Sequence, residues 1–172
     1  VIPRLIEKIE RTYKDTFLNM GQMEVYLEDA RKLPLKDKSI DHVISSPPYY
    51  DTLDYVNSHR LRLAISGYYD EIEKKKLKNS LIQSFESYLP EMEKCIIEMR
   101  RVLKKGGTCV FIVGDTFKGK NIINTAENLQ PVMEKHGFVC HAIIADKIPI
   151  NKSVQKRSTT QKFDRIMIMT KK

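Results

Sequence analysis

Apolar residues recur along this chain at two spacings, and each spacing predicts one kind of element. Recurrence every three to four residues predicts helices over 2–18, 56–65, 84–104 and 125–136. Short apolar or alternating runs between polar and glycine-rich stretches predict strands over 23–27, 40–44, 108–113, 138–145 and 164–170. Strands that alternate with helices in this way are typical of an α/β fold.

The last two predicted strands follow one another without an intervening helix. We expect them to pair antiparallel, because a parallel return normally uses a crossover helix. The prediction is an α/β sheet, mainly parallel with an antiparallel edge hairpin, forming one domain over 1–172 with an N-terminal helix within 1–20. Gly106 and Gly107 follow the helix over 84–104, and we expect them to cap its end.

The composition limits the class of protein and the partners that we expect. The 172 residues are 41% hydrophobic, and no run approaches the roughly 18 apolar residues of a membrane span. The N-terminus does not resemble a signal peptide, so an intracellular, cytoplasmic protein is expected. A net charge of +8 favours a polyanionic partner. The three cysteines lack zinc spacing and are expected to be buried free thiols.

The strand over 40–44, expected to be buried, runs directly into Ser45-Ser46-Pro47-Pro48-Tyr49-Tyr50. Two prolines in a row fix φ and remove two backbone N–H groups, so the chain leaves the strand rigid and extended. Such a loop at the carboxyl end of a strand is where ligands bind in open α/β sheets.

These residues resemble the catalytic motif of the amino-group DNA methyltransferases, which methylate N4 of cytosine or N6 of adenine. Asp29-Ala30 followed by Arg31 is similar to that family's cofactor element, and Leu103 to Gly107 is similar to its helix-to-strand turn. The resemblance implies a Rossmann-like class I fold, S-adenosylmethionine as cofactor and DNA as partner. It assigns Asp29, Ala30 and Ser45 to the cofactor.

The resemblance makes Ser46, Pro47, Pro48 and Tyr49 catalytic. An exocyclic amine is a poor nucleophile because its lone pair is delocalised into the ring. Acceptors aimed at its N–H bonds, here the Ser46 side chain and the Pro47 carbonyl, would draw it toward tetrahedral geometry. Tyr49 would stack on the extruded base. Serine in the first position favours cytosine N4, with adenine N6 or a guanine amine in RNA as alternatives.

Other polar residues have two interpretations each. Tyr50 lines the base pocket or ends the loop, and Asp115 either contacts the base or the cofactor or caps a strand. Cations in the last hairpin contact DNA phosphates or face solvent: Lys152, Lys156 and Arg157. The lysine-rich run 74–78 is better explained as a solvated helix face. The four histidines form no spaced set and are expected to be structural or exposed.

The family's glycine-rich cofactor loop is missing from this sequence, whose first glycine is Gly21. Three explanations stay open. The chain is the C-terminal part of a longer enzyme, as a start at Val1 suggests, or a second polypeptide supplies the loop. Otherwise it is a non-catalytic relative that binds nucleic acid. A homodimer is a further option.

Overall fold

The computed structural model describes residues 22–48, 56, 60–65, 70, 72, 75–76, 78, 82, 86–118, 121–147 and 163–172. Its main sheet has four strands in the order β1 (Ile40–Ser45), β2 (Leu103–Gly114), β6 (Phe163–Lys171) and β5 (Phe138–Lys147). β1 is parallel to β2, whereas β6 is antiparallel to both β2 and β5. The α/β sheet with an antiparallel edge hairpin is confirmed. Only β6 runs against the other three strands.

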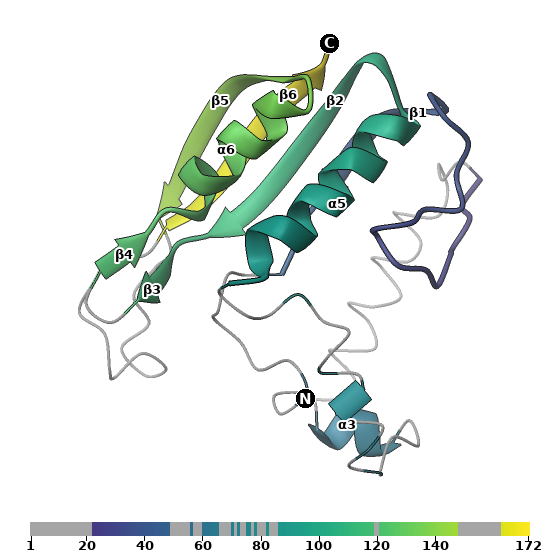
Figure 1. Ribbon diagram of the computed structural model, residues 1–172, viewed down its shortest axis with the longest axis vertical. Helices are drawn as coiled ribbons and strands as arrows, with labels where there is room; N and C mark the ends of the chain where they lie inside the picture. The colour runs from purple at the N-terminus through teal and green to yellow at the C-terminus, as the bar shows by residue number, and fades with distance from the viewer. Residues whose placement is uncertain are drawn as a thin grey trace, which may run out of the picture.

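Two helices, α5 (Tyr88–Val102) and α6 (Thr125–Lys135), cover one and the same face of this sheet (Figure 1). Alternate residues of the strands point into that layer, as the two-residue period of a strand requires. The core therefore lies between two helices and one sheet face. Its largest fully buried side chains include Tyr88, Phe111, Phe138, Met92, Ile96, Leu129, Met133, Met167 and Met169.

The helices predicted over 84–104 and 125–136 are confirmed with shorter bounds. Asn124 caps α6, because its side-chain oxygen accepts hydrogen bonds from the backbone N–H groups of Ala126 and Glu127. In the segment predicted as a helix over 56–65, Val56 is helical and buried and α3 spans Arg60–Ile65. The predicted N-terminal helix, 2–18, lies outside the described residues.

The predicted strand over 23–27 is wrong. Residues 22–29 have no regular secondary structure, and Val25 and Leu27 are 84% and 101% exposed. A strand is stabilised by a neighbouring strand and by packing on one face. The described part of the chain offers this segment neither, so its alternating pattern alone does not make it a strand.

The glycine cap predicted for α5 is also wrong. The helix ends at Val102, and Leu103 is already extended and fully buried as the first residue of β2. Gly106 has φ +74° and Gly107 fits tightly, because a Cβ added to it would lie only 2.9 Å from the carbonyl oxygens of Asp41 and Lys104. The two glycines instead form an irregular bend where the pairing between β1 and β2 shifts register.

β1 differs from the buried strand that the sequence suggested. Among the described strands it lies at the edge of the sheet, and Ile44 on it is 76% exposed. A two-stranded ribbon that the pattern did not indicate, β3 (Thr116–Lys118) with β4 (Asn121–Ile123), follows β2.

The cysteines are free thiols, as expected, with Cys95 and Cys109 buried and Cys140 partly so. Within the described ranges no group of three or more metal-binding side chains comes together. No helix in these ranges is long and apolar enough to cross a membrane.

Candidate active site

A cavity of about 500 Å³ opens at the carboxyl end of β1, beside α5. It brings together the two motifs that are separated in sequence, the Asp29-Ala30 element and the loop that follows β1. Its lining comprises Asp29, Ala30, Arg31, Leu33, Val43, Ile44, Ser45, Ser46, Pro47, Pro48, Ile82, Met92, Cys95, Met99 and Phe111. Six of the residues predicted for the site therefore share one pocket.

Ser46 is held against the neighbouring strand. β1 pairs with β2 up to Ser45, which lies opposite Phe111, and the Ser46 hydroxyl then donates a hydrogen bond of 3.2 Å to the carbonyl oxygen of Ile112. Ser46 is exposed, whereas Pro47 beside it is buried. The hydroxyl proton is thus directed at the protein, and the oxygen retains lone pairs for a ligand donor.

Asp29 begins a tight turn at the rim of the same cavity. Its carboxylate accepts a 2.8 Å hydrogen bond from the backbone N–H of Arg31, and its carbonyl accepts one of 2.9 Å from that of Lys32. The Arg31 guanidinium also donates to the carboxylate, and these hydrogen bonds lower the pKa of Asp29. Asp29 is therefore charged at neutral pH.

The segment after this turn is fastened to α5 by Arg101 and Glu98. The Arg101 guanidinium donates to the carbonyl oxygens of Leu33 and Leu35 at 3.0 and 2.8 Å. Glu98 accepts from Arg101 at 2.8 Å and from the backbone N–H of Leu33 at 2.9 Å. These bonds lower the pKa of Glu98 to about 2, so the anchor remains charged across the physiological range.

The inner wall of the cavity is apolar. Met92, Cys95 and Met99 come from successive turns of α5, and Phe111 comes from β2. Burial raises the pKa of Cys95 to about 11, so the thiol is neutral and behaves as a small apolar group. An apolar wall with a carboxylate at its rim can bury a flat ring and bind polar groups at one side of it.

Asp115 lies elsewhere, in the structure's interior. Its side chain is only 1% exposed, and both carboxylate oxygens accept hydrogen bonds of 3.1 Å from Arg165 on β6. The guanidinium of Arg165 lies 5.0 Å from the centre of the Phe163 ring. Asp115 does not line the cavity, and its contact with a base stays a prediction that would require Arg165 to move.

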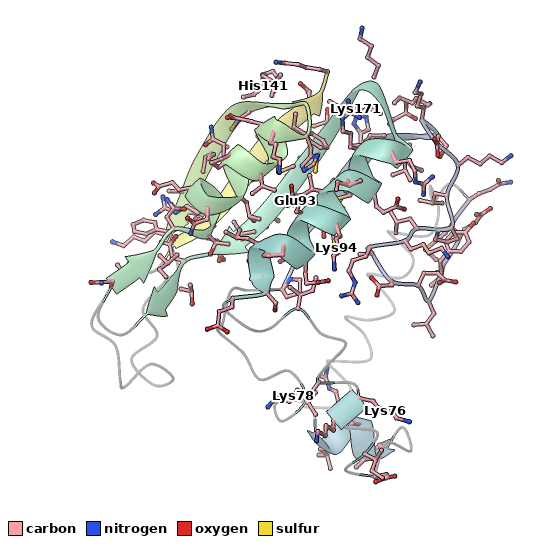
Figure 2. The ribbon with its side chains drawn as sticks, viewed as in Figure 1. Lys76, Lys78, Glu93, Lys94, His141 and Lys171 are labelled. Carbon is pink, nitrogen blue, oxygen red and sulfur yellow. The ribbon has the colours of Figure 1, made fainter. Side chains whose placement is uncertain are left out.

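Other predicted site residues lie outside the described ranges: Tyr49, Tyr50, Lys152, Lys156 and Arg157. Of the lysine-rich run, Lys75, Lys76 and Lys78 are exposed, as expected for a solvated face. Figure 2 labels Lys76 and Lys78.

Three of the histidines are described, and none lines the cavity. His42 is exposed on β1. The Nε2 atom of His136, at the end of α6, lies 2.7 Å from a carboxylate oxygen of Glu93 on α5. The Nε2 atom of His141 lies 2.7 Å from the Thr170 hydroxyl oxygen; Figure 2 labels Glu93 and His141. These contacts support the structural interpretation of His136 and His141.

The sequence placed Arg31 in the Asp29-Ala30 motif without giving it a role, and it did not indicate Glu91 or the apolar wall. Arg31 could have been suspected, because a cation two residues after Asp29 can reach back to that carboxylate. The wall residues could not, since Met92, Cys95, Met99 and Phe111 have the same spacing as ordinary core residues.

Comparison with known families identifies this arrangement. The sequence profile of the N6/N4 DNA methylases, described as DNA methylase, matches residues 40–172. The chain belongs to this family. The match begins at β1 and includes the Ser46–Pro48 loop, α5 and the β5–β6 hairpin, so the methylase assignment covers most of the described fold. No curated protein gives a significant match to this chain.

Solved structures agree on the fold. A candidate DNA modification methylase from Thermus thermophilus is 23% identical, with a TM-score of 0.54, over 84% of this chain and 52% of that one. The same Thermus protein complexed with S-adenosyl-L-methionine is 23% identical, with a TM-score of 0.55, over 83% and 53%. The chain spans about half the length of these Thermus structures.

Proposed function

We propose that this chain forms the base-amine side of an S-adenosylmethionine-dependent DNA methyltransferase whose target is N4 of cytosine. The hydrogen bond from Ser46 to the Ile112 carbonyl carries the proposal. Because that bond uses the hydroxyl proton, Ser46 meets an incoming amine as an acceptor. Membership of the DNA methylase family supports the reaction class.

The chain's own groups would prepare the amine for attack. The Ser46 oxygen and the Pro47 carbonyl would accept hydrogen bonds from the two N–H groups of the amine and localise the nitrogen lone pair toward the methyl group. S-adenosylmethionine supplies an electrophilic methyl group when bound. After transfer the nitrogen is more acidic and loses a proton to solvent, so no strong base is required. Tyr49 would stack on the flipped base, and Pro48 would keep the loop rigid.

The cavity suits the nucleoside half of this cofactor. Adenine is flat and apolar on its faces, which matches the wall of Met92, Cys95 and Phe111. Its amine and the ribose hydroxyls are donors, which match the charged carboxylate of Asp29 beside Ala30 and Ser45. These residues would hold the nucleoside, while the methionine end needs further contacts.

We propose that a glycine-rich segment, from upstream in the same protein or from a second polypeptide, supplies those contacts along β1. No described strand pairs with the outer edge of β1. An edge strand whose N–H and C=O groups are unpaired can pair unspecifically with other chains, and the proposed segment would cover that edge. The sheet face opposite α5 and α6 also bears apolar side chains in two cross-strand rows. These rows are Ile44, Val110, Ile168 and Ala142, then Ile112, Ile166 and Ile144.

DNA would then bind across the carboxyl end of β1. Lys152, Lys156 and Arg157 would contact backbone phosphates, and Tyr50 would contact the target base. Asp115 would contact the base only if Arg165 moved away from it. The net charge of +8 supports a polyanionic partner. Light scattering would measure separately whether the assembly contains a homodimer of this chain.

The test is transfer of tritiated methyl from S-adenosylmethionine to duplex DNA by the assembly that contains this chain. Ser46→Ala should lower kcat by about 100-fold, the usual cost of losing a transition-state acceptor. Ser39→Ala is the matched control, because the Ser39 hydroxyl also donates to a backbone carbonyl, at 2.7 Å, but outside the cavity. Equal rates for all three proteins would overturn the proposal.

The product identifies the base. Nuclease digestion and mass spectrometry should find N4-methylcytosine, whereas N6-methyladenine would replace only the choice of base. Faster transfer to RNA than to duplex DNA would reject DNA as the substrate. A third result would indicate the non-catalytic relative. In that case the complete assembly would transfer no methyl group, and its salt-sensitive binding of DNA would survive Ser46→Ala.

A further inference from the structure

Arg31 donates hydrogen bonds to the Asp29 carboxylate from both its backbone N–H and its guanidinium. Its Nε donates to Oδ1 of Asp29 at 2.9 Å, its Nη2 donates to Oδ2 at 2.5 Å, and its backbone N–H donates to Oδ1 at 2.8 Å. A planar guanidinium that meets a carboxylate edge to edge fixes both the position and the plane of that carboxylate.

The other side of the guanidinium reaches α5. Arg31 Nη1 donates to Oε2 of Glu91 at 2.6 Å, and the Glu91 side chain is only 21% exposed. Glu91 lies in the first turn of α5, immediately before Met92 of the cavity wall. Arg31 therefore connects the carboxylate at the rim to the helix that forms the wall.

This connection matters because Asp29 has little other support. It lies at the end of an irregular segment, and its side chain is 51% exposed. An exposed aspartate on a loop would sample several rotamers, and ordering it on binding would cost affinity. Because Arg31 already holds the Asp29 carboxylate in one orientation, the carboxylate does not have to be ordered when a ligand binds.

These hydrogen bonds leave the Asp29 carboxylate able to accept from a ligand. A carboxylate has about four lone-pair positions. Oδ1 accepts from the backbone N–H of Arg31 and from its Nε at 2.9 Å, whereas Oδ2 accepts from Nη2 and, at a longer 3.1 Å, from the same Nε. Because Nε has a single hydrogen that lies closer to Oδ1, Oδ2 is the less occupied oxygen and can accept from a hydroxyl or amine donor in the cavity.

We infer that Arg31 is a positioning residue for the nucleoside of the methyl donor, acting through Asp29 and anchored by Glu91. This inference rests on the proposed function, and it assigns to Arg31 no contact with the nucleoside itself. Two rival roles predict different behaviour: Arg31 could bind the methionine carboxylate directly, or it could serve only to stabilise the fold.

The experiment measures binding of adenosine and of S-adenosylhomocysteine by calorimetry, in the assembly that transfers methyl groups. Arg31→Met should weaken both ligands by about tenfold. Asp29→Asn should cause a similar loss, and the double variant should be no worse than either single one. Arg31→Lys should restore little, because an ammonium group cannot hold both carboxylate oxygens. Glu91→Gln should weaken both ligands about threefold.

Lys94→Met is the matched control, because Lys94 binds the other oxygen of Glu91 at 2.6 Å and does not line the cavity. It should leave both affinities unchanged. The pH profile separates positioning from mere stability. Adenosine affinity in Arg31→Met should decline on acidification near the ordinary aspartate pKa of about 4, above the pH at which the wild type declines.

Two outcomes overturn the inference while the function stands. Loss of S-adenosylhomocysteine affinity with adenosine affinity intact would show direct contact with the methionine carboxylate. Unchanged affinities in Arg31→Met and Glu91→Gln would show that Asp29 needs no positioning. A wild-type assembly that binds neither ligand and transfers no methyl group would instead reject the proposed function.

Discussion

The hydroxyl of Ser46 donates to the carbonyl oxygen of Ile112, 66 residues away, at 3.2 Å. This contact joins the loop after β1 to the central strand β2 and gives the hydroxyl one orientation. A freely rotating serine could donate to a ring nitrogen as easily as accept from an amine. The Ile112 carbonyl removes that ambiguity, and the chemistry proposed for the site follows from it.

The first prediction concerns pH. The amine's acceptors, a hydroxyl and a backbone carbonyl, do not titrate, and Asp29 has a lowered pKa because Arg31 donates to it. We expect kcat and the KM for S-adenosylmethionine to be flat from about pH 5 to 9. KM should increase only as pH falls through the lowered pKa of Asp29. An inflection in kcat near pH 6.5 to 7 in steady-state profiles, at about the histidine pKa, would contradict this mechanism.

The second prediction concerns the anchor on α5. Glu98→Gln weakens the charge-assisted bonds to Arg101 and the Leu33 N–H, and should lower the free energy of unfolding by about 1–2 kcal/mol in urea titrations. Because its pKa falls from 4.5 to about 2, Glu98 stabilises the fold above pH 4.5, and this contribution disappears as pH falls toward 2. The exposed Glu134 provides the control, since Glu134→Gln should leave the free energy of unfolding nearly unchanged.

The third prediction concerns the ion pair between the buried Asp115 and the partly exposed Arg165. Asp115→Ala leaves the Arg165 guanidinium without its carboxylate partner and should cost about 3 kcal/mol of unfolding free energy. Adding Arg165→Met should recover part of that loss. The exposed pair of Asp41 and Lys104 is the comparison, because solvent screens that pair and Asp41→Ala should leave the free energy of unfolding nearly unchanged. Similar losses for Asp115→Ala and Asp41→Ala would show that the pair is not effectively buried.

The fourth prediction distinguishes two adjacent glycines. A Cβ on Gly107 would lie 2.9 Å from two backbone oxygens, which cannot move without disturbing β1 and β2. Gly106 has φ +74° but no atom within 4 Å of its Cβ position. Gly106→Ala should cost about 1 kcal/mol through backbone strain, and Gly107→Ala about 2 kcal/mol or more, both measured by urea unfolding. The reverse order would refute the bend described here.

Sequence patterns predicted the elements that local residues determine. The periodic apolar positions of α5 and α6 and the apolar runs of β2, β5 and β6 were identified, and their order indicated the edge hairpin. The elements that failed depend on distant partners. Residues 23–27 alternate like a strand but have no described strand beside them, and Leu103 joins β2 because Ile40 lies opposite it.

The same division applies to the site. By itself, the sequence determined that a rigid Ser46–Pro48 loop ends a strand and that Asp29-Ala30 precedes it, because proline restricts the backbone wherever it occurs. Only the tertiary structure decided that both line one cavity, that Arg31 ties Asp29 to Glu91 across 60 residues, and that Asp115 is buried on Arg165. The reason is physical: these contacts join residues far apart in the chain, and packing of α5 and β6 against β2 brings them together.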